Sequence, residues 1–571
     1  MNASPFGAQV VRRTPEVKRI AALPRRVWTE DAAQKLADLL TQEFRRPCGT
    51  MALRPVQAIA LYEAMEVGGL FGPIRVGGGK TLCTLLLPLA LDAKRPVLFL
   101  PAALIEKTWH ERKALAEHWR LATNLQLVSY ESLGLVTSSE KLEYIRPDLI
   151  IADECHYWKN KRAGRTRRVI RYMREHPETR FVALSGTVMK GSLQDFAHML
   201  RWALKSGAPV PLNDEELLDW SNSLDERVNP LARAKPEALF DIGPRDPALA
   251  TIPAARRVFQ SRLLETRGVV ASSAKDGVDC SLRISALEYE PAPVTVTHIA
   301  NMKGTWTTPD GWTFSEALEL RRYIRELALG FHSIWDPRPP VEWVSARREW
   351  ASFVREVLSS SRTLDTELQV ANAVDVGSLT KFREAGTELL VAWRGIRDTF
   401  KIQPKPVWHD DTALRVCAEW AKREKGLIWC EHRHFAYELA KLTGLTYYGA
   451  GGLTDSGASI VHVKPGQAVI LSRQANTTGR NLQAFSRNLI TSIEPSADIN
   501  EQLLGRTHRD GQEADEVHVD VLHGCREHHD AFYRAVDGAK AARDLLGHSQ
   551  KLLLADIVFP NITQRVGPLW V

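Results

Sequence analysis

The sequence has few cysteines and lacks the cysteine pairs typical of disulfide-rich domains and zinc sites. Seven cysteines are scattered through 571 residues, and none belongs to a Cys-x-x-Cys pair. An odd number of scattered thiols argues against a disulfide framework and favours a reducing compartment. We therefore expect a cytoplasmic protein.

Long apolar segments are also absent. No apolar run approaches the ~20 residues that a membrane-spanning helix needs. The longest run, near residues 82–91, is interrupted by Pro88. Arg12, Arg13 and Lys18 near the N-terminus precede no apolar stretch, so we expect neither a signal peptide nor a membrane partner.

The composition has no strong bias. Its 36 glycines and 30 prolines are close to average usage, which excludes collagen-like and low-complexity chains. The 75 Lys and Arg residues exceed the 68 Asp and Glu residues by 7, a mild excess that suits a nucleic-acid partner without requiring one. At roughly 150 residues per domain, the length predicts about three to four domains.

Short apolar runs alternate with helix-length segments in two parts of the chain. Each run is rich in Val, Ile, Leu or Phe and ends in polar or turn residues, which predicts an α/β fold with parallel sheets. The predicted strands fall within 96–102, 125–130, 148–154 and 181–187, and again within 427–431, 468–472, 488–494 and 517–522.

The region between these two blocks is rich in charge and tryptophan and has helical spacing. Residues 315–331 and 342–358 are predicted amphipathic helices, and Trp343, Trp350 and Phe353 recur at the spacing of an apolar face. Tryptophan can stack on bases, but we expect these side chains to form a core. The predicted segments are an N-terminal extension (1–50), a first α/β block (51–205), a helical Trp-rich insert (206–405), a second α/β block (406–540) and a C-terminal tail (541–571).

A glycine-rich loop precedes a helical run in the first block. It consists of Gly77, Gly78, Gly79, Lys80 and Thr81. Glycines allow backbone N–H groups to surround an anion, and the helix N-terminus adds its dipole. Lys80 is then expected to reach phosphate oxygens and Thr81 to ligate Mg²⁺. Because Ile74 replaces the first glycine of the full pattern, a plain strand-to-helix turn remains the alternative.

An acidic pair ends the run at 148–154. Asp153 can hold Mg²⁺, and Glu154 can orient or deprotonate an attacking water, as phosphoryl transfer requires. Ligands of open α/β sheets bind beyond the carboxyl ends of the strands, where this pair is expected. The alternative is an acidic turn without catalytic function.

Two arginines lie three residues apart near the end of the second block. Arg506 and Arg509 are expected to point the same way on a helix or tight turn, which suits an oxygen-rich anion. An arginine supplied from a second domain can accelerate phosphoryl transfer by roughly 10³–10⁵-fold. A solvated basic helix end is the alternative.

A basic run follows the acidic pair. Residues 159–171 contain seven basic and no acidic side chains, a pattern that can neutralise phosphates without reading bases. A solvated helix face is the competing interpretation. The candidate nucleic-acid contacts are Lys159, Asn160, Lys161 and Arg162.

The order of these motifs resembles the Swi/Snf-like group of superfamily-two helicases and translocases. The resemblance covers residues 53–190 and 425–522. LRPVQ, ending in Gln57, is similar to the adenine-side glutamine motif of this group, and GGGKT and DECH are similar to its two Walker motifs. SGT at 185–187, GRNLQ at 479–483 and QLLGRTHRDGQ at 502–512 resemble its later motifs. The chain is also similar, more distantly, to helicases of tailed bacteriophages.

The resemblance implies two RecA-like parallel-sheet lobes that hold ATP and Mg²⁺ between them. It assigns Gln57 and the glycine loop to nucleotide binding, and Arg506 and Arg509 to catalysis with Glu154. Hydrolysis would be coupled to movement through Ser185, Thr187, Gly479 and Gln502.

The activity implied is translocation on nucleic acid, which we expect to be double-stranded DNA, in the host cytoplasm if a phage encodes the protein. Two alternatives remain. One is a strand-separating DNA or RNA helicase, and the other is a regulatory nucleotide switch without motor activity.

Overall fold

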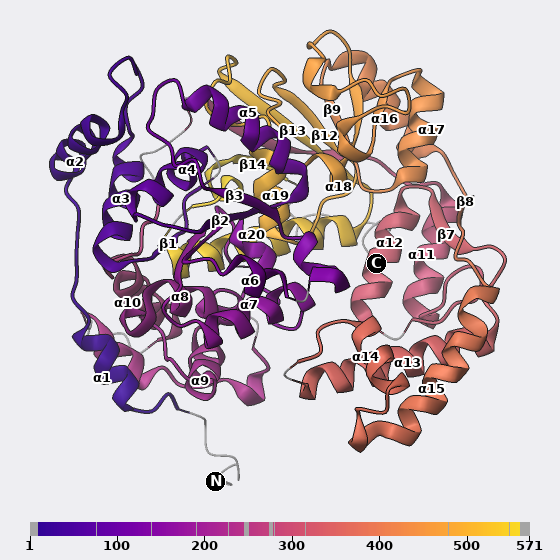
Figure 1. Cartoon of the computed structure of the whole chain (residues 1–571). Coiled ribbons are helices and arrows are strands. Elements are labelled where there is room, and N and C mark those ends of the chain that lie inside the picture. Colours follow the sequence, from indigo (N-terminus) through magenta and orange to yellow (C-terminus); the bar gives the residue numbers. More distant parts are fainter. Residues whose placement is uncertain are drawn as a thin grey trace, which may run out of the picture. The chain divides into compact units, whose positions relative to one another are not determined.

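The computed structural model describes residues 10–559 except positions 76, 139, 190, 227, 245–250, 273–277, 279, 315, 362, 478 and 548. The chain forms two compact units (Figure 1). Unit 1 comprises Met1–Gly277, Ser496–Gly505 and Val536–Leu554, and unit 2 comprises Val278–Pro495, Arg506–Ala535 and Ala555–Val571. Parts of the predicted N-terminal extension (1–9) and C-terminal tail (560–571) lie outside the described residues.

Unit 1 is built on a five-stranded parallel sheet with the order β1-β5-β4-β2-β3. The strands are β1 (Leu70–Gly72), β2 (Pro96–Leu100), β3 (Gln126–Ser129), β4 (Leu149–Asp153) and β5 (Arg180–Leu184). The last four confirm the strands predicted in the first block. Only β1 was not predicted, because three residues are too few to show a periodic pattern.

Helices cover both faces of this sheet. Successive residues of a strand point to opposite faces, so Ile150 and Ala152 enter one apolar core while Leu149 and Ile151 enter the other. Such burial on both faces explains why these strands are continuous apolar runs. The helices of unit 1 are α1 (Pro15–Ala22), α2 (Glu30–Phe44), α3 (Pro55–Val67), α4 (Lys80–Ala90), α5 (Ile105–Leu115), α6 (Lys141–Ile145), α7 (Gly164–Glu175), α8 (Ala197–Leu204), α9 (Asp214–Leu224), α10 (Ile252–Leu264), α19 (Ala497–Leu504) and α21 (Lys551–Leu554).

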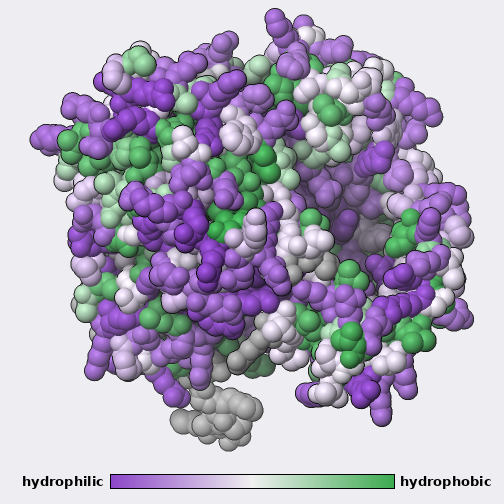
Figure 2. All heavy atoms as spheres, viewed as in Figure 1, coloured by the Kyte–Doolittle hydropathy of each residue, from purple (hydrophilic) through white to green (hydrophobic). Residues whose placement is uncertain are grey.

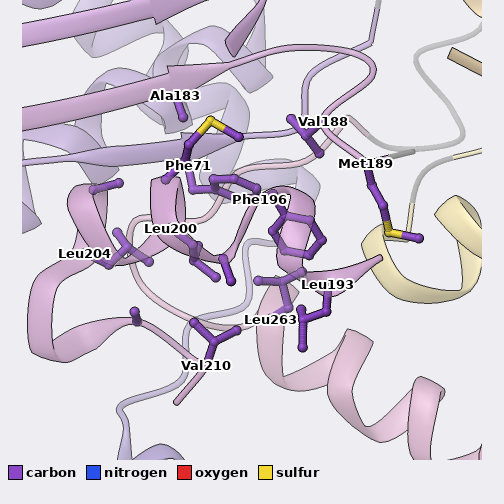
Figure 3. Packing of buried hydrophobic residues seen from close by; sticks show 14 of the residues in the cluster. Phe71, Ala183, Val188, Met189, Leu193, Phe196, Leu200, Leu204, Val210 and Leu263 are labelled. Atoms are coloured by element: carbon purple, nitrogen blue, oxygen red, sulfur yellow. The ribbon is translucent and has the colours of Figure 1, made fainter. Parts of the chain in front are cut away.

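Helix α8 anchors the edge of the sheet that contains β1 and β5. Phe71 of β1 stacks on Phe196 with ring centroids 5.5 Å apart, and Leu200 extends the same apolar surface (Figure 3). Val188 and Met189, which follow β5, are buried in this core. Because both ends of the segment 185–187 are held by buried residues, its polar side chains have a defined position.

Unit 2 contains a seven-stranded parallel sheet with the order β10-β11-β9-β12-β13-β6-β14. Four of its strands confirm those predicted in the second block. The strands are β6 (Ser281–Glu288), β9 (Leu427–Cys430), β10 (Tyr447–Tyr448), β11 (Val469–Ser472), β12 (Arg487–Ile490), β13 (Glu516–His523) and β14 (Asp556–Val558). A separate antiparallel pair consists of β7 (Phe331–Trp335) and β8 (Pro404–Trp408).

The helices of unit 2 include the two amphipathic helices predicted in the insert. Trp343, Trp350, Phe353 and Val357 are all buried, which confirms that they form a core. The helices are α11 (Pro293–Thr305), α12 (Ala317–Ala328), α13 (Val341–Ser360), α14 (Glu367–Asp375), α15 (Arg383–Ile396), α16 (Thr412–Arg423), α17 (Arg433–Thr443) and α18 (Arg473–Asn476). A further helix, α20 (Arg526–Leu546), contributes its first half to unit 2 and its second half to unit 1.

The division into units differs from the predicted segments. Residues 206–405 do not form one insert, because residues up to 277 belong to unit 1 and the remainder to unit 2. Helix α10 packs its Val258, Phe259 and Leu263 into the core of unit 1. Strand β6 lies beside β13 in the large sheet of unit 2, although the predicted boundary placed it in the helical insert.

Hydrophilic residues cover most of the face seen in Figure 2, and apolar residues form separate patches. Among the helices in the described part of the chain, none has both the length and the apolar composition needed to span a membrane. All seven cysteines are free, and only Cys48 is exposed.

Candidate active site

The glycine loop connects β1 to α4 in unit 1 and folds around the ammonium of its own lysine. Lys80 is the first residue of α4, and its Nζ donates to the carbonyl oxygens of Ile74 and Arg75, at 3.1 Å each. Gly77 and Gly79 adopt positive φ angles of 89° and 77°, which favour glycine. The loop therefore has the backbone conformation and the charge of an anion-binding site.

The Gln57 side chain stabilises this loop through two hydrogen bonds. Its Oε1 accepts a hydrogen bond from the backbone of Arg54 at 2.8 Å, and its Nε2 donates to the carbonyl of Gly79 at 3.1 Å. A Cβ atom at position 79 would lie 2.1 Å from this Nε2. The φ angle at position 79 thus favours glycine, and a Cβ there would displace the Gln57 amide from its hydrogen bond.

A pocket of about 470 Å³ lies beside the loop. Gln57, Gly79 and Thr81 line it, and Glu111 and His118 contribute further polar groups. Its volume lies within the usual range of small-molecule sites. The loop residues therefore lie next to a space that can hold a ligand larger than a phosphate.

The acidic pair lies at the carboxyl end of β4. Glu154 has a left-handed backbone conformation with φ 59°, which is uncommon for a residue other than glycine and costs free energy. Ser185, just beyond the neighbouring strand β5, donates its hydroxyl to Glu154 Oε2 at 2.9 Å. The Glu154 carboxylate is therefore held in one position at the carboxyl edge of the sheet.

The pKa values of the two carboxyl groups are shifted in opposite directions. Burial, followed by the adjacent Glu154 charge, raises the pKa of Asp153. Burial also acts to raise the pKa of Glu154, but the Lys80 ammonium and the hydrogen bond from His156 outweigh it and lower that pKa. Glu154 thus remains ionised at neutral pH, as a general base must.

Four side chains link the acidic pair to α19 within unit 1. His156 Nδ1 lies 3.0 Å from Ser185 Oγ and 3.3 Å from Thr187 Oγ1. Gln502 Nε2 lies 3.2 Å from His156 Nε2 and 3.3 Å from Thr187 Oγ1. A change at Glu154 can therefore be transmitted to Gln502 through direct hydrogen bonds.

The basic run has mixed surroundings. Lys159 Nζ pairs with Asp498 Oδ2 of α19 at 3.1 Å, Lys161 Nζ pairs with Asp214 Oδ1 at 3.3 Å, and Arg168 is buried. Asn160 and Arg162 are exposed. Of the four candidate nucleic-acid contacts, Lys159 therefore holds α19, whereas Asn160 and Arg162 face solvent.

Replacing Lys159 with alanine is expected to destabilise the protein by about 3 kcal/mol, near the lower end of the cost of breaking a buried ion pair. The Asp498 side chain is 4% exposed and that of Lys159 is 29% exposed. Burial already raises the pKa of Asp498, against the effect of Lys159, and removing the ammonium should raise it further. Because a raised carboxyl pKa favours the folded state in acid, the loss should be largest near neutral pH and shrink as the pH falls.

Urea unfolding of the wild type and Lys159→Ala at several pH values measures this effect. Lys161→Ala serves as the control, because the side chain of its partner Asp214 is 74% exposed. Equal stability of Lys159→Ala and Lys161→Ala at neutral pH would contradict the assigned role of Lys159.

The predicted arginines belong to unit 2, where both contact the segment after Gly479. Arg506 is buried and its Nη1 donates to the carbonyl of Arg480 at 3.1 Å. Arg509 is half-buried and its Nη1 donates to Asn481 Oδ1 at 2.6 Å. Gly479 has a φ of 80°. The two guanidiniums and the segment 479–481 thus form one cluster in unit 2, whereas Gln502 belongs to unit 1.

Two contributors to the site in unit 1 were not identified from the sequence. His156 connects four of the site residues, and its position inside the DECH motif was the available signal. Asp498 pairs with Lys159, but the two residues are 339 positions apart and no sequence pattern indicates that they pair.

Asp153 has the features of a magnesium ligand. Its Oδ1 is buried and accepts no hydrogen bond from any residue that the structure describes, so a cation would satisfy it. No group of three or more His, Cys, Asp or Glu side chains in the described part of the chain can hold a metal ion by itself. This pattern fits Mg²⁺, which binds one or two carboxylates and completes its shell with water and phosphate oxygens.

Comparisons of the chain with protein-family models and with curated proteins found no match. Its function must therefore be inferred from the order of its motifs and the geometry of the site.

Proposed function

We propose that the protein is a nucleic-acid-dependent ATPase that moves along double-stranded DNA. In this proposal the two sheets are the cores of two RecA-like lobes. The observation that carries the proposal is the convergence of Lys80, Glu154 and Ser185 at one edge of the sheet in unit 1. This edge combines an anion-binding loop, an ionised carboxylate and a hydrogen-bonded connection to Gln502.

Each residue of this edge has a distinct part in ATP hydrolysis. The loop amides and Lys80 bind the phosphates, and the neighbouring pocket accepts the base. Thr81 and Asp153 would hold Mg²⁺, which neutralises phosphate charge when bound. Glu154 orients a water molecule and accepts its proton as the water oxygen attacks the γ-phosphorus. The bond from that phosphorus to the β–γ bridging oxygen breaks, and ADP and phosphate leave.

Movement requires that hydrolysis alter the relation between the two units. We assign the completion of the site to Arg509 and Arg506 of unit 2, which would stabilise the charge of the transition state. The position of Gln502 would depend on the state of the acidic pair, because Gln502 is hydrogen-bonded to His156 and Thr187. The exposed Asn160 and Arg162 would contact the nucleic-acid backbone. Binding to the backbone relies on positive charge and needs no contacts with the bases.

ATP turnover in the presence of duplex DNA, single-stranded DNA and RNA tests the proposal. We expect duplex DNA to stimulate turnover most, with a stimulation that weakens as salt is raised. Strand displacement on forked substrates would favour a strand-separating helicase. Turnover that no nucleic acid changes would contradict the proposal and favour a regulatory nucleotide switch.

Lys80→Ala is expected to reduce turnover by about 10²–10³-fold, the usual cost of removing a group that stabilises transition-state charge. Lys94→Ala is the matched control, because Lys94 is exposed and its ammonium pairs with the exposed Asp92. Steady-state phosphate release measures both variants. Undiminished hydrolysis by Lys80→Ala would exclude the glycine loop as the phosphate site.

A further inference from the structure

A second pocket, of about 310 Å³, lies entirely within unit 2. Aromatic side chains from three elements line it: Trp312 from the loop after α11, Tyr323 from α12 and Trp335 from the end of β7. The nucleotide site uses none of these residues. The pocket is therefore independent of the ATPase site in unit 1.

The loop that carries Trp312 is well defined. Thr307 and Thr313 form an antiparallel bridge, and the backbone of Trp312 donates to the hydroxyl of Thr308 at 2.8 Å. Gly311 has a φ of 89° at this turn. Trp312 is nevertheless 41% exposed. A rigid loop that holds a tryptophan partly in solvent presents a flat apolar surface to a ligand.

The geometry of the two tryptophans restricts what can bind. Their ring centroids lie 5.9 Å apart and their planes are inclined by 49°. Two parallel rings must be about 7 Å apart to hold a third between them, twice an aromatic contact distance. A planar ligand can therefore stack on one indole and meet the other ring with its edge, an arrangement that aromatic groups favour.

The polar groups of the pocket differ in availability. Asp310 is already engaged, because Thr308 Oγ1 donates to its Oδ1 at 2.6 Å and Arg338 lies 3.6 Å from its Oδ2. Glu319 is half-buried, and its carboxylate forms no hydrogen bond or ion pair with any residue that the structure describes. The pocket thus offers one open carboxylate beside its aromatic walls.

The Arg338 guanidinium lies at the exposed rim of the pocket. The side chain of Arg338 is 70% exposed, and it also donates to the backbone carbonyl of Asp310. Although the guanidinium pairs with Asp310, its exposed N–H groups can also donate to a phosphate at the entrance. Aromatic side chains, a carboxylate acceptor and an exposed guanidinium together match a nucleotide.

We propose that this pocket binds one unpaired nucleotide, with its base stacked on Trp312 and its phosphate beside Arg338. Glu319 accepts N–H groups of the base edge. Guanine presents two adjacent N–H donors there, whereas the single N–H of thymine is flanked by two carbonyl oxygens that repel a carboxylate. The inference deepens the proposed function, because it gives unit 2 a contact with a displaced or single-stranded base.

Fluorescence anisotropy with the full-length protein tests the strand-bound form. We expect a duplex with one unpaired guanosine to bind at least about fivefold more tightly than the fully paired duplex, the smallest usual gain from one stacked base. An abasic residue in the unpaired position should abolish this preference, and an unpaired thymidine should reduce it.

Variants identify the pocket as the source of the preference. Trp312→Ala should lose it and Trp312→Phe should retain part of it, whereas Glu319→Gln should lower the preference for guanine over thymine. Trp306→Ala is the matched control, because Trp306 is 40% exposed but does not line the pocket. Thermal unfolding checks that the variants remain folded.

Saturation-transfer NMR with free GMP distinguishes the source of the nucleotide and separates this inference from the proposed function. Transfer to GMP that Trp312→Ala abolishes supports the pocket even if no DNA binds, in which case only the proposed function fails. Duplex binding without a preference for the unpaired base, together with GMP transfer that does not depend on Trp312, overturns the inference alone. Trp312-dependent transfer to tetramethylammonium but not to GMP would also overturn it.

Discussion

Replacing Arg509 with alanine is expected to slow ATP hydrolysis by about 10³–10⁵-fold, the range found for arginines that complete phosphoryl-transfer sites from a second domain. The dissociation constant for ATP should change little, because the arginine acts on charge that develops in the transition state. Arg509 is suited to this role because its guanidinium is half-buried and is oriented by Asn481.

Single-turnover hydrolysis and equilibrium binding of a labelled ATP analogue measure the two effects separately. Arg487→Ala is the control, because Arg487 is a partly exposed arginine of the same unit that pairs with Glu424. Asn481→Ala should give a smaller loss than Arg509→Ala, since it removes only an orienting bond. An Arg509→Ala variant that binds ATP poorly but hydrolyses it normally at saturation would refute the role.

Glu154→Gln is expected to lower the hydrolysis rate by about 10²–10⁴-fold, the usual contribution of a positioned general base. The amide can still accept the hydrogen bond from Ser185, but it cannot take a proton from water. ATP should therefore bind and remain unhydrolysed, and Glu175→Gln, which alters an exposed carboxylate of the same unit, should behave as the wild type.

The pH profile provides an independent check on Glu154. Because its pKa is lowered, the wild type should lose no turnover through protonation of Glu154 between about pH 8 and about pH 6. Normal hydrolysis by Glu154→Gln at any pH would remove the general base from this mechanism. It would leave the acidic pair with a structural role only.

Much of the fold could be predicted because local patterns report burial on both faces of a sheet. The runs that became β2, β4 and β5 contribute alternate residues to two cores, so the successive positions that enter these cores must all be apolar. The same patterns predicted the buried tryptophans of α13. By contrast, β6 was not predicted. It alternates apolar and polar residues instead of forming a continuous apolar run, and it lies far in sequence from its partner strand β13.

The division of the chain could not be predicted for a related physical reason. Residues 206–277 have no strand pattern, yet their helices pack into the core of unit 1. The segment of α19 lies between residues of unit 2 in the sequence but belongs to unit 1, where Asp498 and Gln502 hold it. Such pairings depend on tertiary contacts that periodicity does not encode.

The candidate site was predictable where backbone chemistry demands particular residues. The positive φ angles at Gly77 and Gly79 explain the glycines of the loop. His156 was missed because its role depends on Ser185 and Gln502, which meet it only after folding.

We propose that an ATPase site on unit 1 needs the arginines of unit 2 and is controlled by nucleic acid. ATP turnover by the wild type and by Arg509→Ala, each with and without duplex DNA, tests it most directly. We predict that duplex DNA accelerates the wild type several-fold and leaves the low rate of Arg509→Ala unchanged. Equal acceleration of both proteins, or a wild-type rate that duplex DNA does not change, would contradict the account.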